Sequence, residues 1–286
     1  MRTSPELRKN FISELVKNDI LFITSTKSTV FIKDILNIHS YNIRHGILSF
    51  ISIIASTQEG VEYIIKENFD IIKKIIEIVK GTEDGQVLQR FCLSILQKMG
   101  GSNKDIISLY LKFGLIDWII KLLQRSRINK NINSFCLDYS SALLANILKS
   151  EVTITFLENN SSVCRNLIET FLSMIDDNTP TTMLKHILMC LGYLNIEKFS
   201  DIKAECRFLS RGQQFYENLC KLRTNSEEEE INKYKIIELC KYVFKIENKG
   251  KKENFGKNNY EIENIIKEYE NKKDSIVFEC FQDEIN

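Results

Sequence analysis

The chain has 286 residues, of which 43% are hydrophobic and 27% are charged, an ordinary composition for a globular protein. Its formal net charge is only +1, which excludes the strong positive field that proteins use to attract nucleic acid or anionic membranes. Two prolines and 11 glycines are too few for the many turns of a β-sandwich or barrel, so an all-α fold is favoured. The length lies near the upper limit of one compact core, so we expect two domains or an elongated array.

The first predicted element is a helix that opens at Ser4-Pro5-Glu6. Serine is a good N-cap, proline suits the first helical position, and an acidic residue suits the first turn. Leu7, Phe11 and Leu15 recur at helical spacing and predict its apolar face. A connector rich in serine and threonine follows, at Thr24 to Thr29.

From Val30 onward one pattern repeats: an apolar helix, a polar turn and a longer amphipathic helix. Its clearest copy has a helix from Leu115 to Leu123 directly after Gly114, and a second helix from about Phe135 to Ile147. Gly114 is expected in the left-handed conformation that ends the preceding helix, and Asn68 and Asn160 are expected to act in the same way.

The repeat units are predicted to start, each with its shorter apolar helix, at Val30, Phe69, Leu115, Cys164 and Phe215, at spacings of 39, 46, 49 and 51 residues. Armadillo and related helical repeats have periods of about 40–47 residues. Each unit presents an apolar face that only a neighbouring unit covers, so we predict an armadillo-like superhelix, an α-solenoid. The alternative is an irregular helical bundle.

The predicted organisation has four parts. Residues 1–29 form an N-terminal capping helix and connector, and residues 30–222 form the armadillo-like repeats. Residues 223–244 form a degenerate terminal repeat, and residues 245–286 form a charged, partly disordered tail. Within the tail, Lys249–Lys257 is a basic run that suits a solvated linker better than a nuclear signal or a tubulin-tail contact, and Tyr260–Tyr269 has a short helical pattern.

No motif in the sequence indicates an enzyme, a metal or a cofactor. The eight cysteines form no C-x2-C pair and none lies at zinc-ligand spacing from a histidine, so we expect mainly buried, reduced thiols. His39 and His45 bracket a turn without a partner at ligand spacing. A nucleophile elbow, a glycine-rich phosphate loop and a His-Glu-x-x-His motif are all absent. We therefore predict no catalytic, metal or cofactor-binding residues.

The N-terminus lacks the apolar segment of a secretory signal peptide, and no apolar run approaches the ~18 residues that a membrane span needs. We therefore expect a protein of the cytosol, nucleus or cytoskeleton. Its partners are expected to be other proteins, with no nucleic acid and no membrane insertion.

Armadillo proteins usually bind partners along a groove lined by the long helix of each unit. The polar edges of these helices carry the candidate residues named below, together with Ser49 and Ser94. For each of these residues the alternative is an ordinary solvated face. The candidate groove residues are His45, Arg90, Gln97, Asp138, Asn146, Lys149, Lys185 and Tyr193.

Trp118 is the only tryptophan and lies on the shorter helix of the third unit. Nuclear-import adaptors repeat a tryptophan and an asparagine on their long helices, and Asn146 invites comparison with them. Because Trp118 lies on a shorter helix instead, its position argues against a row of residues that binds cargo peptides as those adaptors do. Trp118 and Leu122 are four residues apart on one helix, and we expect both to be buried against the helix around Leu144.

Three segments carry a resemblance to a known family. They are ISELVKNDIL followed by FIKDILNIHSYNIRHGILSFISIIASTQEGVEYI, then LQRFCLSILQKM, and then GLIDWIIKLL with LDYSSALLANILKS. In order and spacing they resemble the C-terminal armadillo region of the LisH-domain armadillo-repeat proteins of cilia and basal bodies. The resemblance covers about Phe11 to Leu222, and changes in that family underlie Joubert syndrome.

The resemblance implies a non-catalytic scaffold at the basal body or centriole and in the cilium. That family is implicated in cilium assembly, length control and modification of axonemal microtubules, through ciliary or microtubule-associated protein partners. The matched region starts after the family's LisH and coiled-coil parts, so it does not imply dimerisation through LisH. The alternative is a soluble adaptor that binds extended peptides in nuclear transport or signalling.

Overall fold

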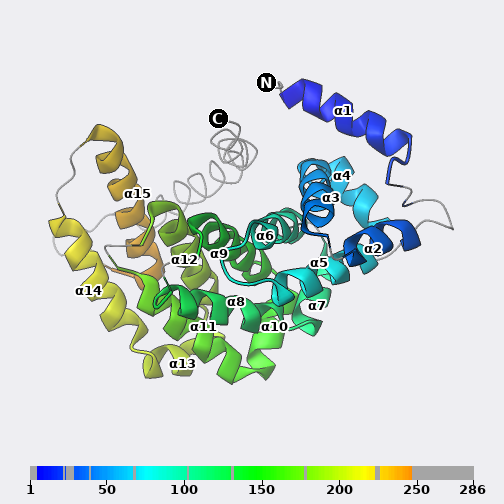
Figure 1. Cartoon of the computed structure of the whole chain (residues 1–286). Helices are drawn as coiled ribbons and strands as arrows, with labels where there is room; N and C mark the ends of the chain where they lie inside the picture. The colour runs from blue at the N-terminus through cyan, green and yellow to red at the C-terminus, as the bar shows by residue number, and fades with distance from the viewer. Residues whose placement is uncertain are drawn as a thin grey trace. The chain divides into compact units, whose positions relative to one another are not determined.

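The computed structural model describes residues 5–246 with these exceptions: residues 22, 24–28, 39, 67–68, 102, 130–131, 177–178 and 223–225. Met1–Phe244 form one compact unit, and the architecture below is that of this unit (Figure 1). Three predicted features lie outside the described residues: the stop at Asn68, the basic run Lys249–Lys257 and the helix Tyr260–Tyr269.

The described residues are helical with no strand among them, and the helices come in successive groups of three, which we call units. The first unit comprises α1 (Pro5–Lys17), α2 (Thr29–Asn37) and α3 (Tyr41–Ile54). The second comprises α4 (Gln58–Ile65), α5 (Asp70–Gly81) and α6 (Val87–Met99), and the third comprises α7 (Lys104–Lys112), α8 (Leu115–Ser126) and α9 (Ser134–Leu148). The fourth comprises α10 (Glu151–Asn159), α11 (Ser161–Met174) and α12 (Thr181–Leu194). The fifth follows the 3-10 turn η1 (Glu197–Phe199) and comprises α13 (Ser200–Glu205), α14 (Phe208–Lys221) and α15 (Glu227–Phe244).

Helices with the same place in successive units pack against one another. The third helices form a continuous row, α3 on α6, α6 on α9, α9 on α12 and α12 on α15, which we call the third-helix layer (Figure 1). Second helices pack likewise, α2 on α5 and α8 on α11, as do the first helices α1 on α4 and α7 on α10. Such nearest-neighbour stacking is that of a helical repeat rather than of an irregular bundle.

Two residues with left-handed backbones determine where second helices begin. Gly114 has φ 62° directly before α8, which confirms the predicted start at Leu115. Arg207 takes nearly the same conformation, φ 54°, directly before α14. The second helix of the fifth unit therefore begins at Phe208, and the predicted start at Phe215 is wrong. The sequence hides this start because residues other than glycine seldom adopt positive φ.

Asn160 does not act as the predicted left-handed stop. Its φ is −132°, and its side-chain Nδ2 donates a hydrogen bond to the carbonyl oxygen of Phe156, 2.8 Å away. The next helix, α11, begins at Ser161, three residues before the predicted start at Cys164. The predicted domain boundary after residue 222 falls between α14 and α15, which pack against each other.

The apolar face predicted for α1 is wrong. Leu7 and Phe11 are 61% and 55% exposed, whereas Ile12 is fully buried. α1 packs on α4, and Ser13 Oγ donates a hydrogen bond to Glu59 across that contact. The buried side of α1 is therefore the one centred on Ile12 and Ser13, which the spacing of its larger apolar residues does not reveal.

Trp118 is not part of the core, contrary to the sequence prediction. It is only partly buried, whereas Leu122, four residues later on α8, is fully buried. The buried residues of α8 are Leu115, Ile116, Ile119, Ile120, Leu122 and Leu123. At about 100° per residue, Trp118 lies on the flank of this face while Leu122 lies closer to its centre.

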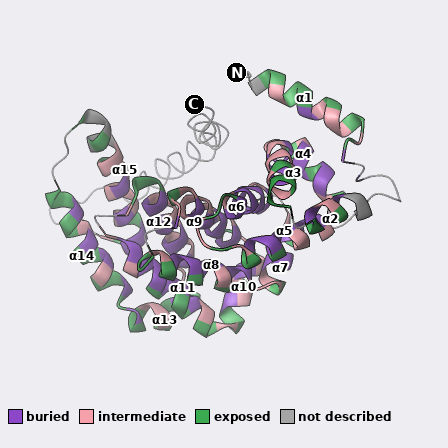
Figure 2. Cartoon of the chain, in the orientation of Figure 1, coloured by how far each residue is buried: buried purple, intermediate pink, exposed green. Residues whose placement is uncertain are grey.

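The hydrophobic core runs along the stack of helices, and it includes most of the cysteines that the structure describes. Buried residues dominate α6 and α9 and are sparse on α1 (Figure 2). The buried free thiols are Cys92, Cys136, Cys164, Cys190, Cys206 and Cys240. Burial raises the pKa of each of these thiols, so they stay protonated at neutral pH and act as small apolar side chains. Cys220 is exposed, and Cys280 lies outside the described residues.

Candidate partner surface

All eight candidate groove residues lie on, or directly after, third helices of the first four units. His45 is on α3, Arg90 and Gln97 are on α6, Lys185 and Tyr193 are on α12, and Asp138 and Asn146 are on α9, with Lys149 just after its end. Because these helices pack in sequence, the structure brings residues about 45–49 positions apart onto adjacent helices. Lys149 is exposed, Gln97 is only 7% exposed, and the other six are partly buried.

Several of these residues connect neighbouring third helices, which was not predicted. Asn146 Nδ2 donates a hydrogen bond to the backbone oxygen of Gln97, 2.9 Å away, and so joins α9 to α6. Gln97 Oε1 is buried without a hydrogen-bond partner. Gln97 therefore contributes its backbone to the stack, and its buried amide is not available to a partner at the surface.

Asp138 and Lys185 also make contacts across the layer. Thr182 Oγ1 on α12 donates a hydrogen bond to Asp138 Oδ1 at 2.9 Å, and burial nevertheless raises the pKa of the Asp138 carboxyl. Lys185 Nζ donates a hydrogen bond to Asn232 Oδ1 on α15 at 3.3 Å, and burial lowers the pKa of this amine. Both side chains are partly buried, so they still form part of the surface.

Aromatic and cationic side chains meet at the first turns of α3, α6 and α9. The rings of His45 and Phe91 are nearly perpendicular, with centroids 5.2 Å apart. The guanidinium of Arg90 lies 5.1 Å from the centroid of Phe91 and 5.6 Å from that of Phe135 on α9. These contacts orient Arg90 between the second and third units, because a guanidinium is attracted to the faces of aromatic rings.

Lys98 on α6 is a polar residue of the third-helix layer that the sequence prediction missed. Its Nζ donates hydrogen bonds to the backbone oxygen of Ser52 at 2.8 Å and to Ser52 Oγ at 3.1 Å, joining α6 to α3. Ser52 Oγ also lies 3.3 Å from Ser94 Oγ. Burial and then the positive charge of Arg8 lower the pKa of Lys98 to about 7. At about 100° per residue, Lys98 lies about 80° from Arg90 around α6 and Gln97 lies closer, so helical spacing from Arg90 does not single out Lys98.

A serine and a histidine also meet between α9 and α12. Ser141 Oγ and His186 Nδ1 are 3.3 Å apart, and Ser141 Oγ donates to the backbone oxygen of Asp138. Ser141 is fully buried, so a substrate at the surface would not reach its hydroxyl. The pair therefore serves as a contact between helices.

Among the residues that the structure describes, no group of three histidine, cysteine or acidic side chains is arranged to hold a metal ion. In the same part of the chain, no helix is both long enough and apolar enough to cross a membrane.

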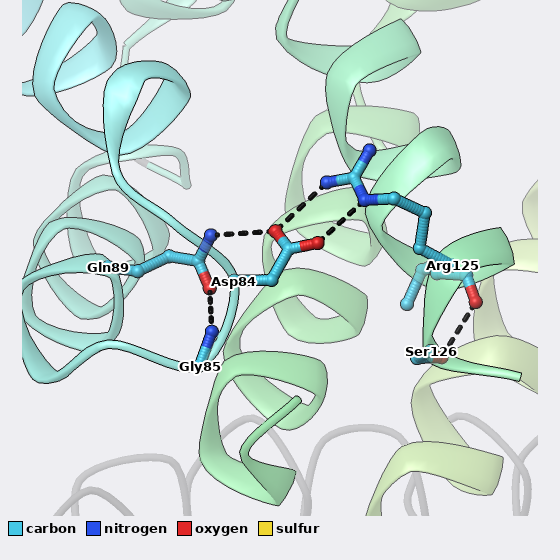
Figure 3. A network of polar contacts seen from close by, with 6 residues as sticks. Asp84, Gly85, Gln89, Arg125 and Ser126 are labelled. Atoms are coloured by element: carbon cyan, nitrogen blue, oxygen red, sulfur yellow. Dashed lines mark hydrogen bonds and ion pairs between the residues drawn. The ribbon is translucent and has the colours of Figure 1, made fainter. Parts of the chain in front are cut away.

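A second polar network, not foreseen from the sequence, joins the second unit to the third (Figure 3). Asp84 lies in the turn between α5 and α6, and its carboxylate accepts two hydrogen bonds from Arg125 on α8, with N–O distances of 2.6 and 2.9 Å. Gln89 Nε2 donates to the same carboxylate at 3.2 Å, and Gln89 Oε1 accepts from the backbone nitrogen of Gly85. The hydrogen bond from Arg125 lowers the pKa of Asp84. The network fixes the α5–α6 turn against the neighbouring unit.

Comparison with solved structures identifies the fold. No protein-family model matches the chain, and no curated protein matches it. A designed armadillo repeat protein in complex with the peptide (KR)4 superimposes with a TM-score of 0.59 at 14% sequence identity, covering 82% of this chain and 85% of the designed protein.

Two further structures agree. A computationally designed armadillo repeat protein for modular peptide recognition has a TM-score of 0.53 at 13% identity, with 82% of this chain and 94% of that one covered. An engineered protein has a TM-score of 0.55 at 14% identity, with 85% and 94% covered. Together with the three-helix units and their stacking, these likenesses show that the chain folds as an all-α, armadillo-type solenoid.

Proposed function

We propose that this protein is a non-catalytic armadillo scaffold that binds an extended segment of a partner protein on the third-helix layer. One observation carries the proposal: the stack places polar and aromatic side chains from four successive units next to one another. A continuous row of this kind suits an extended segment, since each unit can contact a few successive residues of it.

The fold supports the same view. The designed armadillo protein in complex with (KR)4 is similar in fold, and another similar design is described as made for modular peptide recognition. These designs support the proposal, because each is a stack of this fold whose description names a peptide or peptide recognition.

For the cellular role, we propose a scaffold of the basal body or centriole and the cilium. The support is the resemblance of three segments of this chain to the LisH-domain armadillo-repeat proteins. In the structure these segments correspond to α1–α4, α6 and α8–α9. In this role the protein would support cilium assembly, length control and axonemal microtubule modification through ciliary or microtubule-associated partners. The second candidate, an adaptor in nuclear transport or signalling, would use the same layer.

Localisation distinguishes these two roles. Tagged full-length protein in a ciliated cell is expected to mark basal bodies or cilia together with the cytoplasm. A nuclear or uniformly cytosolic signal would contradict the ciliary role and favour the adaptor.

Binding tests the proposal common to both roles. Partners captured with the full chain should be lost on Arg90→Glu, which changes the layer between units two and three. They should be retained on Lys121→Glu, which makes the same charge change at an exposed residue of α8. Equal capture by both variants would exclude the third-helix layer as the binding face.

A further inference from the structure

The third helices of the first four units have a charge balance that differs from that of the other helices in these units. α3, α6, α9 and α12 together contain four lysines and arginines, Arg44, Arg90, Lys98 and Lys185, and a single acidic residue, Asp138. The second helices α2, α5, α8 and α11 contain seven lysines and arginines and five acidic residues. The first helices α1, α4, α7 and α10 contain five lysines and arginines and seven acidic residues. Acidic residues are therefore depleted from the third helices of the first four units, in a chain whose net charge is only +1.

The charges of this layer also lie together in space. His45 contacts Phe91, Arg90 lies over Phe135, and Thr182 bonds to Asp138, so the first turns of α3, α6, α9 and α12 are neighbours. Arg44, Arg90, Asp138 and Lys185 each occupy the fourth or fifth position of their helix. The positive ends of four helix dipoles consequently lie beside three cations and one carboxyl group along one edge of the layer.

The row has a defined limit at its C-terminal end. α15 begins with four consecutive glutamates, Glu227 to Glu230, and packs on α12. The cations of the row therefore come from the first, second and fourth units, α9 of the third unit contributes none, and the sequence turns acidic in α15 of the fifth. Asp138 on α9 is the one acidic residue of α3, α6, α9 and α12, and its carboxylate would oppose a negatively charged ligand.

From this arrangement we infer that the segment bound by the third-helix layer is acidic: an extended protein segment rich in aspartate and glutamate, contacting Arg44, Arg90 and Lys185 and lying beside the aromatic rings of His45 and Phe135. This inference rests on the proposed function and names the partner's chemistry. It also separates this chain from its designed structural neighbour, which is in complex with the basic peptide (KR)4.

The test compares fluorescein-labelled (DE)4, (KR)4 and the neutral (SG)4 by anisotropy, using the full chain. Binding of (DE)4 should exceed binding of the other two and should weaken as salt is raised. Arg90→Gln and Lys185→Gln should each weaken it roughly 3- to 10-fold. Asp138→Asn should strengthen it about 2- to 5-fold, because asparagine keeps an acceptor for Thr182 while it removes the opposing charge.

Lys121→Gln is the matched control, since it removes one positive charge from an exposed position on α8. It should leave the affinity for (DE)4 unchanged.

A variant that folds poorly would lose affinity for the peptide, so poor folding cannot produce the gain in affinity expected from Asp138→Asn. Preference for (KR)4 or (SG)4, a loss of affinity on Asp138→Asn, or an equal effect of Lys121→Gln would overturn the acidic preference but leave peptide binding intact. Failure of all three peptides to bind, with cellular partners still captured through Arg90, would overturn only the preference. Failure of both assays would remove the proposed function itself.

Discussion

The third helices of the first and second units have similar apolar content and very different burial. α3 buries only Leu48, Ile51, Ser52 and Ile54, and leaves Ile43 44% exposed. α6 buries most of its residues, and the buried ones include the polar Gln89, Ser94 and Gln97. The difference follows from position, because α6 lies between α3 and α9, whereas α3 has a third-helix neighbour on one side only. In a stacked array, burial depends on the number of neighbouring units as much as on the residues of the helix itself.

Truncation of one apolar residue in each region should show this difference most strongly. Leu144 on α9 is fully buried between α6 and α12, so Leu144→Ala should cost about 2–5 kcal/mol of unfolding free energy through lost burial and a cavity. Ile43→Ala on α3 should cost less than about 1 kcal/mol. Denaturant titration of both variants measures the two values, and equal losses would mean that the end unit is packed as tightly as the centre.

Glycine-to-alanine changes sharpen the comparison within the N-terminal region. A Cβ at Gly60 on α4 would lie 1.9 Å from the backbone oxygen of Ile54, so Gly60→Ala should destabilise the protein by about 1–3 kcal/mol or more. A Cβ at Gly46 on α3 would meet no atom within 4 Å, so Gly46→Ala should stabilise the protein by about 0.5–1 kcal/mol through helix propensity. Thermal melts of the two variants should shift in opposite directions. A loss of stability in both would show that α3 is tightly surrounded at Gly46 as well.

Lys98 links the two regions and should make their contact sensitive to pH. Its folded pKa of about 7 lies below the ordinary value of 10.5, so the unfolded chain binds more protons and stability from this group rises with pH between about 7 and 10.5. Lys98→Met should therefore stabilise the protein most at pH 7 and below, with a gain that shrinks as pH rises. The measurement is the difference in unfolding free energy between parent and variant from pH 6 to 8.5, before the thiols of the unfolded chain ionise. A difference that does not change with pH would mean that Lys98 keeps an ordinary pKa.

The smallest effect is expected at the exposed ion pair between the second and third units. Asp84→Asn should cost about 0.5–1 kcal/mol, because the two hydrogen bonds from Arg125 lie at a partly exposed site. The pKa of Asp84 is lowered on folding, so this stabilisation is present above the unfolded value of about 3.9 and is lost as pH falls through the folded value. Urea titrations of parent and variant at pH 7 and at low pH check this. An unchanged difference at the two pH values would show that the charge of Asp84 does not contribute.

Much of the fold was predictable from the sequence because helical periodicity and Gly114 are local signals. The start of α8 after Gly114 was predicted correctly, and the core positions of α6, such as Leu88, Cys92 and Ile95, are buried. The start of α14 was not, because Arg207 takes a left-handed backbone that its side chain does not announce. Trp118 was misplaced because residue type suggests burial, whereas its angular position on α8 puts it on the flank of the buried face.

The surface was predicted less well, for a physical reason. Which side chains meet across the layer depends on the stacking register, and contacts such as Asn146 with Gln97 join residues 49 positions apart. Local pattern identifies a polar residue on a helix edge, but it does not show whether a neighbouring unit will cover it. Gln97 was therefore assigned to the groove although it is buried, and Lys98, the adjacent residue, was overlooked.

Photo-crosslinking tests the central claim most directly, because it reports which helices a bound segment touches. A (DE)4 peptide carrying a benzophenone group would be irradiated with the full chain, and the adducts located by mass spectrometry of proteolytic fragments. Our account predicts adducts on α3, α6, α9 and α12, reduced by Arg90→Gln and unaffected by Lys121→Gln. Adducts confined to α5, α8 and α11 would contradict the assignment of the third-helix layer as the binding face.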